Sequence, residues 1–375
     1  MTEGTLASHG LRIAVIMGGQ SAERDVSLRT GETVVLALAP SCRVKPVQIL
    51  SNGRWLVPAG FVGSHLTKEP RSWFRGEGKP ILDALSGLVG EGIDAAFNAL
   101  HGPMGEDGTI QGLFRMLEIP LTGPDVIPAA VTMDKRLTKQ VLLSAGLSTP
   151  RFFTMKAAAP SSWPAICQRE AGRMAFPWIV KPVRLGSSVG VAIFRDLDGL
   201  ARGMPGVVAR WPESALSDDL LIEEVVRGRE LTCGVLEVSG PPHALLPIEI
   251  RPRDHEFFNY EAKYVPGASE EICPAPLSPQ ETALVQETAL RVHTVLDCAP
   301  LSRTDMFLTP RGTIEVLEVN TLPGMTATSL IPLSASKEGI LLADLLDSLV
   351  QHALHRHRER SRESSASLET GSRSC

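Results

Sequence analysis

The segment SRTDMFLTPRGTIEVLEVN, residues 302–320, decides how the C-terminal part of this chain folds. Two stretches in which apolar and polar residues alternate surround residues 309–312, whose proline and glycine are typical of a tight turn. Alternation with a period of two indicates a β-strand that is buried on one face. The segment therefore predicts an antiparallel hairpin with one polar face.

The polar face of that hairpin carries side chains suited to a metal ion. Residues two positions apart in a strand point to the same side, so Arg303 lies beside Asp305, and Glu318 lies beside Asn320. Oxygen donors beside a cation fit Mg²⁺ that bridges transferring phosphates, with the arginine neutralising charge on the phosphoryl group. A solvated polar face with a salt bridge gives the same pattern, so the hairpin alone leaves both interpretations open.

A glycine-rich turn lies upstream, in KPVRLGSSVG at residues 181–190. Strands predicted at 178–182 and 189–194 make it the turn of a second hairpin. Its small residues expose backbone N–H groups toward a phosphate, and Lys181 adds a point charge; Lys135 is a second cation that phosphates would draw to the same place. No helix bearing Gly-Lys-Ser/Thr follows, so this is not a Walker-type loop. Most such turns are only turns, and an exposed lysine is the simpler interpretation of each cation.

The first third of the chain alternates apolar strands with helical patterns, which is typical of a parallel sheet covered by helices. Strands are predicted at residues 11–17 and 93–100, and a helix at 26–38. Residues 51–80 are rich in Gly, Pro and Trp, which indicates an insertion.

Each of these two strands ends in a polar loop, at residues 18–23 and 101–108. Ligands of open α/β sheets gather at the carboxyl ends of the strands. Glu23 is placed to hold a substrate ammonium group, and His101 to lie near a substrate carboxylate. Helix capping by Ser21 explains part of the same composition.

The remaining chain predicts further elements of mixed type. A helix is expected at residues 127–145, with Gly146 as its stop, and a new unit begins near 221. Residues 251–276 are polar and lack a period, which is typical of a functional or disordered loop. The last elements are helices at 279–296 and 339–355 and a charged tail at 356–375 that is expected to be disordered.

Composition excludes several classes of function. Hydrophobic residues make up 43% and charged residues 21%, as in ordinary globular domains, and the net charge of −5 creates no basic field for nucleic acid or anionic lipid. The six cysteines show no C-x-x-C pair or metal-ligand spacing. No apolar stretch reaches the ~20 residues needed to cross a bilayer, and no secretory signal is present, so a cytoplasmic protein is expected.

Seven blocks of sequence, in order from about residue 11 to 345, resemble the D-alanine–D-alanine ligase family. They are GGQSAER (18–24), HGPMGEDG (101–108), MDK (133–135), KPVRLGSSVG (181–190), YEAKY (260–264), RTD (303–305) and EVNTLPGMT (318–326). The complete set in this order is highly specific. The resemblance implies an ATP-grasp fold of α/β and α+β type with an N-terminal parallel-sheet domain.

The resemblance also implies a division into domains. An N-terminal α/β substrate-binding domain spans residues 1–124, a central ATP-grasp lid domain 125–220, and a C-terminal ATP-grasp catalytic domain 221–357. Residues 358–375, the charged tail, depart from the family and receive no role.

The resemblance implies which residues bind the amino acids and which bind ATP. The amino-acid set is Glu23 for the amino group of the first D-alanine, His101 for its carboxylate, Arg303 and the backbone at Gly324 for the transition state, and Ser187, Ser329, Leu330 and Tyr264 for the second D-alanine and loop closure. The ATP set is Lys135 and Lys181 for the phosphates, Glu223 and Glu230 for adenine and ribose, and the backbone from Glu224 to Val226 for the adenine edge. Lys263 is implied to reach ATP from the long loop. Asp305, Glu318 and Asn320 are implied ligands of two Mg²⁺ or Mn²⁺ ions.

The implied activity is an ATP-dependent ligase that joins two D-alanines through an acyl phosphate for peptidoglycan precursor synthesis. A homodimer is expected from the family alone. D-serine or D-lactate as second substrate is an alternative, although Tyr264 and Leu330 resemble the members that use D-alanine. A biotin-carboxylating ATP-grasp enzyme leaves the His101 block unexplained, and an inactive sensor would have lost a metal ligand.

Overall fold

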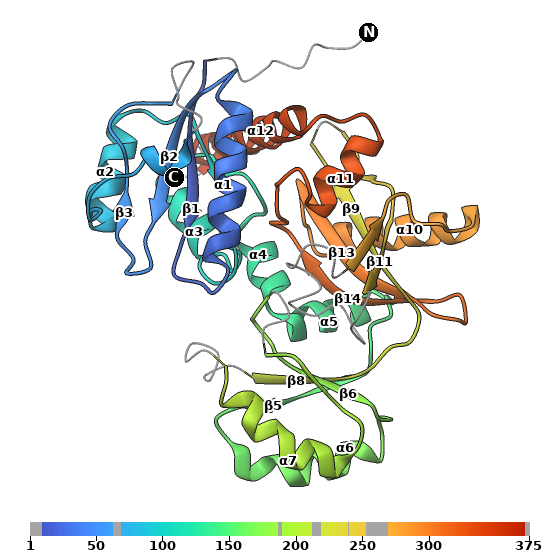
Figure 1. Cartoon of the computed structure of the whole chain (residues 1–375). Coiled ribbons are helices and arrows are strands. Elements are labelled where there is room, and N and C mark those ends of the chain that lie inside the picture. The colour runs from blue at the N-terminus through green and yellow to red at the C-terminus, as the bar shows by residue number, and fades with distance from the viewer. Residues whose placement is uncertain are drawn as a thin grey trace.

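Three sheets, each covered by helices, make up the computed structural model (Figure 1). It describes residues 10–62, 69–186, 190–211, 219–238, 240–252 and 269–371. The expected parallel sheet at the N-terminus, followed by antiparallel sheets, is confirmed. Among the helices of these residues, none is long and apolar enough to span a membrane.

The N-terminal sheet is parallel except for one edge strand. Its order is β3-β2-β1-β4, and β1 pairs in parallel with both β2 and β4. Its elements are β1 (Arg12–Gly18), α1 (Arg24–Leu38), β2 (Arg43–Ile49), β3 (Trp55–Leu56), the 3-10 turn η1 (Pro70–Ser72), α2 (Ile81–Gly90), β4 (Ala95–Asn98) and α3 (Thr109–Met116). Residues 13–17 of β1 are completely buried, as expected of a continuous apolar strand covered on both faces. The loops after β1 and β4 therefore meet at one edge.

The central sheet is antiparallel, with the order β5-β8-β6-β7. Its elements are β5 (Phe152–Lys156), the 3-10 turn η2 (Pro160–Ser162), α6 (Trp163–Ala171), β6 (Trp178–Pro182), β7 (Ala192–Phe194), α7 (Leu197–Val208) and β8 (Asp219–Glu224). The helices α6 and α7 cover one face, where Trp163, Trp178 and Met204 form its core (Figure 1). The strand expected to open the third unit near residue 221 instead lies inside this sheet, because β8 pairs with both β5 and β6.

The third sheet contains the hairpin expected from residues 302–320. Its order is β12-β11-β9-β13-β14, with β10 beside β9. Its elements are β9 (Arg229–Leu236), β10 (His243–Ala244), β11 (Ile248–Pro252), β12 (Ser269–Ile272), α10 (Pro279–Val295), β13 (Leu301–Leu308), β14 (Ile314–Asn320), α11 (Leu330–Lys337) and α12 (Leu342–Gly371). The ends of the expected long loop form the antiparallel pair β11 and β12, and residues 253–268 lie outside the described ranges.

The single helix expected at residues 127–145 is in fact two helices. α4 (Val126–Met133) and α5 (Lys135–Ser144) are separated by Asp134, whose backbone is extended and whose carboxylate accepts a hydrogen bond from Leu137 N at 2.9 Å. An aspartate cap of this kind begins a new helix, whereas the apolar spacing continues through the break. The break places Lys135 at the first position of α5.

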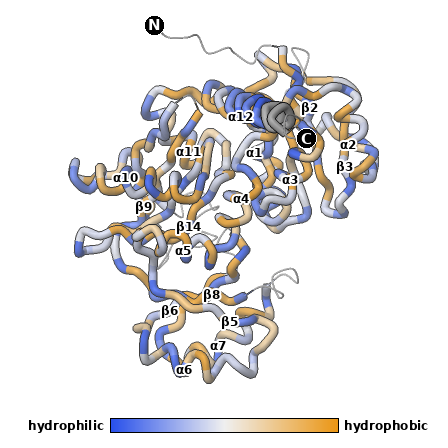
Figure 2. Tube along the Cα trace, turned by 180° about the vertical axis from the view of Figure 1, so that it is seen from behind, coloured by the Kyte–Doolittle hydropathy of each residue, from blue (hydrophilic) through white to orange (hydrophobic). Residues whose placement is uncertain are grey.

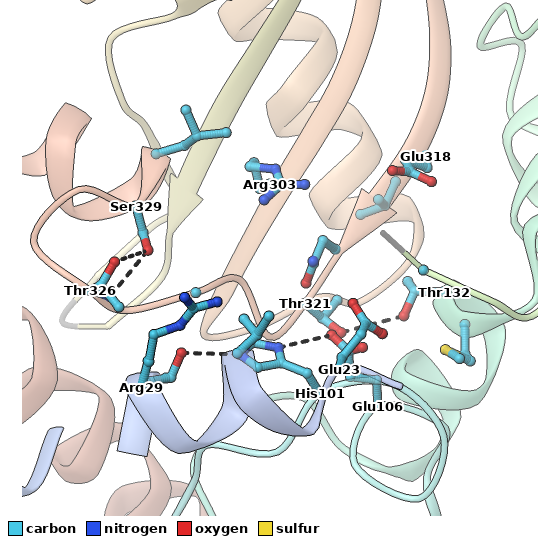
Figure 3. A pocket seen from close by; sticks show the side chains of 18 of the residues that line it. Glu23, Arg29, His101, Glu106, Thr132, Arg303, Glu318, Thr321, Thr326 and Ser329 are labelled. Atoms are coloured by element: carbon cyan, nitrogen blue, oxygen red, sulfur yellow. Dashed lines mark hydrogen bonds and ion pairs between the residues drawn. The ribbon is translucent and has the colours of Figure 1, made fainter. Parts of the chain in front are cut away.

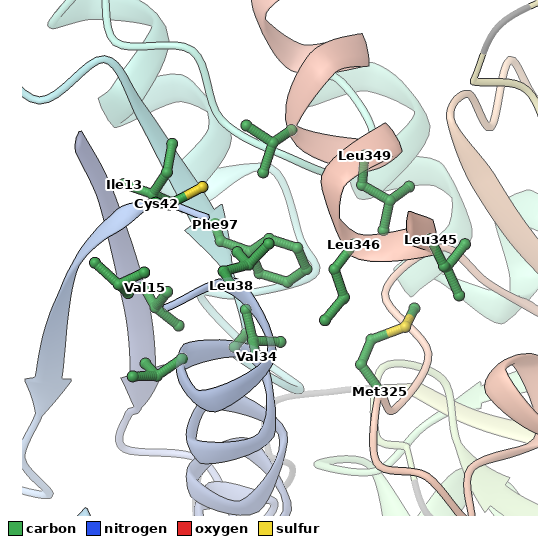
Figure 4. Packing of buried hydrophobic residues seen from close by; sticks show 14 of the residues in the cluster. Ile13, Val15, Val34, Leu38, Cys42, Phe97, Met325, Leu345, Leu346 and Leu349 are labelled. Carbon is green, nitrogen blue, oxygen red and sulfur yellow. The ribbon is translucent and has the colours of Figure 1, made fainter. Parts of the chain in front are cut away.

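The helix α12 joins the two ends of the chain in one apolar core. Its Leu345, Leu346 and Leu349 pack in the same cluster as Ile13, Val34, Leu38 and Phe97 of the N-terminal unit (Figure 4). The N-terminal sheet therefore receives part of its cover from the last helix of the chain.

The expected disordered tail differs from the structure as far as Gly371. α12 continues through this segment, although its later turns are strongly hydrophilic (Figure 2). Arg356 donates from Nη2 to the carbonyl oxygen of Leu121 at 3.0 Å, and Arg360 Nη1 lies 2.8 Å from Asp125 Oδ2. Polar anchors on the N-terminal unit thus hold a segment whose low apolar content suggested disorder. Residues 372–375 are not described.

Candidate functional site

Two cavities adjoin each other where the three sheets approach. The smaller, of about 520 Å³, lies among α1, the loop after β4 and the chain that follows β14 (Figure 3). The larger, of about 820 Å³, lies between the central and third sheets. Lys135 and Glu318 line both cavities, so the two spaces meet at this pair.

The expected site residues divide between the two cavities. The smaller cavity is lined by Glu23, His101, Lys135, Arg303, Glu318, Asn320, Gly324, Ser329 and Leu330. The larger cavity is lined by Lys135, Lys181, Glu223, Glu224, Val226, Glu230, Asp305 and Glu318. Ser187, Lys263 and Tyr264 lie outside the described residues. Every other expected residue therefore lines at least one of the two spaces.

The loops after β1 and β4 bring Glu23 and His101 into the smaller cavity (Figure 3). Ser21 Oγ donates to the carbonyl oxygen of His101 at 2.7 Å and so joins the two loops. The His101 ring is almost buried, with Nε2 3.2 Å from Thr30 Oγ1 and Nδ1 4.0 Å from Glu106 Oε1. Contacts on both ring nitrogens fix the orientation of the imidazole.

The glycine-rich turn of the central unit reaches this same corner. A Cβ atom at Gly186 would lie 3.0 Å from Glu23 Oε2, and one at Gly102 would lie 2.8 Å from it. The backbone thus approaches the Glu23 carboxylate from two sides. Gly102 also has a φ of 72°, a left-handed conformation that favours glycine.

The hairpin of β13 and β14 places its polar residues as the sequence predicts. Arg303 pairs with Asn320 in the register, and Asp305 pairs with Glu318. The Arg303 guanidinium contacts the Asp305 carboxylate through two bonds, Nε to Oδ1 at 2.9 Å and Nη2 to Oδ2 at 2.8 Å. Thr232 donates to Asp305 Oδ1 at 2.6 Å from the neighbouring strand. These contacts fix a row of polar and charged side chains on the hairpin, and this row lines both cavities.

The donor set of this row fits a hard divalent cation. It consists of the carboxylates of Asp305 and Glu318 and the amide oxygen of Asn320, which are oxygen ligands of the kind that Mg²⁺ prefers. Among the described residues, no group of three or more His, Cys, Asp or Glu side chains is arranged to hold a metal. Two carboxylates with one amide also fit a site that a nucleotide phosphate completes.

A buried charge network closes one wall of the larger cavity. Glu223 of β8 is 1% exposed, and its two carboxylate oxygens lie 2.5 Å from Lys139 Nζ and 2.5 Å from Lys181 Nζ. Burial opposes ionisation of Glu223, but the two ammonium groups outweigh it and hold the pKa of this carboxyl below its usual value. Glu223 is therefore held by two protein cations while it also lines the larger cavity, where the resemblance implies that it faces the base or sugar of a nucleotide.

Lys135 occupies the junction of the cavities. Its Nζ donates to the carbonyl oxygen of Leu185 at 2.8 Å and lies 3.6 Å from Glu318 Oε2. The first contact ties the start of α5 to the glycine-rich turn, and the second ties it to the hairpin.

The chain after β14 supplies the far wall of the smaller cavity. Ser329 Oγ accepts from Thr326 N at 3.1 Å and lies 2.8 Å from Thr326 Oγ1 (Figure 3). A Cβ atom at Gly324 would lie 2.9 Å from Ser329 Oγ, so glycine permits this tight turn. Backbone groups near Gly324 consequently lie beside the cavity without a covering side chain.

Several residues that line the site were missed in the sequence. Val26 and Thr30 lie on α1 about one and two turns beyond Glu23, so helical spacing from Glu23 would have found them, and Arg29 lies beside Thr30. Glu271 of β12 also lines the smaller cavity; burial raises the pKa of its carboxyl, and Arg303 opposes that shift. No sequence signal distinguishes Glu271, because it lies within the polar segment 251–276, which has no regular period.

Comparison with known proteins gives a consistent result. A family model described as D-ala D-ala ligase N-terminus matches residues 12–124, and one described as D-ala D-ala ligase C-terminus matches residues 141–351. The D-alanine--D-alanine ligase of Syntrophobacter fumaroxidans is 41% identical over 352 residues, which cover 93% of this chain and 99% of that protein.

Solved structures agree over the whole chain. The D-alanine-D-alanine ligase from Coxiella burnetii matches with a TM-score of 0.77 and 28% identity, covering 98% of this chain and 100% of its own. The D-alanine--D-alanine ligase from Bacillus anthracis complexed with ATP matches with a TM-score of 0.71 and 29% identity, covering 94% and 100%. The agreement extends across all three sheets and not over one domain alone.

Proposed function

The chain belongs to the D-alanine–D-alanine ligase family, and from this premise we propose how its own residues divide the reaction among them. The enzyme joins two molecules of D-alanine, the step that supplies a dipeptide for peptidoglycan synthesis. One observation carries the proposal: a larger cavity suited to a nucleotide meets a smaller polar cavity at Lys135 and Glu318. That junction is where a terminal phosphate and a substrate carboxylate would come together.

The proposed chemistry has two steps. A carboxylate oxygen of the first D-alanine attacks the terminal phosphorus of ATP, the bond from that phosphorus to ADP breaks, and an acyl phosphate forms. The amine of the second D-alanine then attacks the acyl carbon, and phosphate leaves from the tetrahedral intermediate as the nitrogen loses a proton. Catalysis rests on positioning and electrostatics, so no serine or cysteine acts as a nucleophile.

The first D-alanine is assigned to the corner formed by the loops after β1 and β4. Glu23 receives the ammonium group, and His101 lies beside the carboxylate region with its ring fixed by Thr30 and Glu106. The close approach of Gly186 to Glu23 closes this corner from the central unit. A charged group held in so enclosed a position orients the substrate strongly.

ATP is assigned to the larger cavity. Lys135 and Lys181, which line this cavity, are assigned to its phosphates. Lys263, which is expected to reach ATP from the long loop, lies outside the described residues. The backbone from Glu224 to Val226 reads the adenine edge, and Glu230 faces the ribose. The Bacillus anthracis relative, which was solved with ATP, supports a nucleotide in a protein of this fold.

Asp305, Glu318 and Asn320 are assigned as ligands of two Mg²⁺ or Mn²⁺ ions. When bound, these ions supply positive charge that offsets the negative charge of the transferring phosphoryl group. Arg303 lies in the same row and stabilises charge on the acyl side, together with backbone N–H groups near Gly324.

The second D-alanine is assigned to the wall around α11. Ser329 and Leu330 line the smaller cavity there, and Ser187 and Tyr264 are expected to meet it when the long loop closes. Exclusion of water by that closure protects the acyl phosphate from hydrolysis.

The wider organisation follows as part of the same proposal. The N-terminal unit (1–124) binds the first substrate, while the central (125–220) and third (221–357) units clamp ATP. Two elements cross these limits: β8 continues beyond residue 220, and α12 continues beyond residue 357. A homodimer in the cytoplasm, where ATP is available, is proposed from the family.

Product identification tests the proposed function. Purified protein incubated with ATP, Mg²⁺ and D-alanine should yield one dipeptide and one phosphate per ATP consumed, measured by mass spectrometry and a phosphate assay. Parallel reactions with D-serine or D-lactate beside D-alanine identify the second substrate. A preferred mixed product would reject D-alanine in the second position, and the absence of any condensed product would reject the ligase mechanism.

A further inference from the structure

Lys139 is a buried cation that the mechanism above does not use. It lies in α5, is 1% exposed, and does not line either cavity, although Lys135 on the same helix lines both. Its ammonium group lies 2.5 Å from Glu223 Oε1 and donates to Thr149 Oγ1 at 2.5 Å. Thr149 in turn donates to the carbonyl oxygen of Val316 at 2.8 Å. The position of Lys139 is therefore fixed by three elements.

Two lysines contact the single carboxylate of Glu223. Lys139 occupies one carboxylate oxygen and Lys181 the other, so two positive charges share one negative charge. Only Lys181 lines the larger cavity, and its side chain is 13% exposed. Burying an ammonium group without reason is costly, so the second cation calls for a physical explanation.

Consider the same site without Lys139. Among the described residues, Lys181 would then be the single cation in contact with Glu223. Separating the two would cost much free energy, because the buried carboxylate would be left unpaired. Lys181 would be held on Glu223 and would not be available to a phosphate.

We propose that Lys139 is a positioning residue that keeps the Glu223 carboxylate neutralised while Lys181 turns toward a phosphate of ATP. The inference rests on the proposed function, since it requires Lys181 to contact the nucleotide. In this arrangement Lys139 never touches the substrate. It acts through Glu223, and the phosphate supplies the negative charge that matches the additional cation.

A titration follows from the same geometry. Burial lowers the pKa of the Lys139 ammonium, Glu223 of β8 opposes the shift, and Lys181 of β6 reinforces it. Glu315 of β14 also faces Lys139 and favours its charged form, although burial raises the pKa of that carboxyl. Lys139 therefore loses its proton at a lower pH than an ordinary lysine, and affinity for ATP should fall on the alkaline side as it does so.

The first test compares Lys139→Met with Lys139→Arg and a matched control. Lys139→Met should raise KM for ATP at least about tenfold while KM for D-alanine changes less than about twofold. Lys139→Arg should restore part of the affinity and move its alkaline loss to higher pH, because the guanidinium keeps its proton. The control is Lys45→Met: Lys45 is also fully buried and paired, 2.6 Å from Glu91, but it lines neither cavity. The control variant Lys45→Met should lower Tm and leave both KM values unchanged.

The second test is a double-mutant cycle that a purely structural lysine would not satisfy. In the Glu223→Gln background no carboxylate remains to hold Lys181, so adding Lys139→Met should change KM for ATP less than about twofold. If Lys139→Met has the same effect in both backgrounds, or behaves like Lys45→Met, the inference is wrong. Direct titration with a fluorescent ATP analogue gives the same comparison without turnover. Failure of the wild type to form dipeptide, or an unchanged KM for ATP in Lys181→Met, would instead reject the proposed function.

Discussion

The two cavities are built on different principles. The larger one is walled by two antiparallel sheets, and its charges are paired in the protein before any nucleotide arrives: Glu223 with two lysines, and Asp305 with Arg303. The smaller one is walled by loops that follow strands and precede helices, and glycines bring the backbone close to Glu23. Phosphate binding therefore depends on charged side chains that the protein has already positioned. Amino-acid binding depends on how closely the loops surround the substrate.

The difference predicts separable effects. Substitutions on the larger cavity should alter ATP affinity alone, and those on the smaller cavity should alter D-alanine affinity alone. Only the residues at the junction should alter both. Substitutions at four positions test that division.

The largest effect is expected at the junction. Glu318→Gln removes a charged oxygen ligand and the partner of Lys135, so kcat should fall at least ~100-fold with Tm nearly unchanged. The measurement is dipeptide formation over a range of Mg²⁺ concentrations. Glu287→Gln, the same change on an exposed position of α10, serves as control. Near-normal turnover at saturating Mg²⁺ would remove Glu318 from the metal site.

A smaller and one-sided effect is expected from the larger cavity. Lys181→Met should raise KM for ATP by roughly 10- to 100-fold, because a charged contact to phosphate is lost. KM for D-alanine should remain within about twofold. Equal changes in both constants would show that the two cavities are not independent at this residue.

The reverse pattern is expected from the smaller cavity. Glu23→Gln keeps the shape of the side chain but loses its charge, so KM for the first D-alanine should rise about tenfold while KM for ATP is unchanged. Asp25→Asn, two positions along and exposed, is the matched control. A change in ATP affinity alone would assign Glu23 to the wrong substrate.

The smallest effect concerns the loop that is expected to cover both cavities. Under the proposed loop closure, Tyr264→Phe should remove one neutral hydrogen bond, worth on the order of 1 kcal/mol, or about fivefold in affinity for the second D-alanine. The variant should also use D-lactate relatively better. A competition between D-alanine and D-lactate, with both products quantified, measures this. Wild-type affinity with an unchanged product ratio would place Tyr264 on the surface.

Local patterns in the sequence predicted local geometry well. The period of two in residues 302–320 placed Arg303 beside Asp305 and Glu318 beside Asn320, and the register of β13 and β14 confirms it. The apolar runs at the N-terminus likewise predicted the parallel strands β1 and β4. A strand that is buried on both faces consists almost entirely of apolar residues, so its own sequence reveals it.

Features that depend on distant partners escaped the sequence. The sequence around Lys139 does not distinguish it from an exposed helical lysine. In the folded protein it is buried, and Glu223 of the distant strand β8 contacts its ammonium group. In the same way, nothing in the residues of β8 shows that this strand pairs with β5 and β6 instead of β9. The tail was misjudged because its anchors, Leu121 and Asp125, lie more than two hundred positions away.

The helix α12 has a consequence for the order in which the protein can be made. During synthesis β1, α1 and β4 leave the ribosome more than two hundred residues before Leu345, Leu346 and Leu349, which complete their apolar core. Until then one face of the nascent sheet stays open to solvent and to other chains, a state prone to aggregation. The N-terminal sheet is thus translated early but acquires its complete core late. A chain truncated before α12 would keep this apolar face exposed and would require chaperones, even though every residue assigned to catalysis had been synthesised.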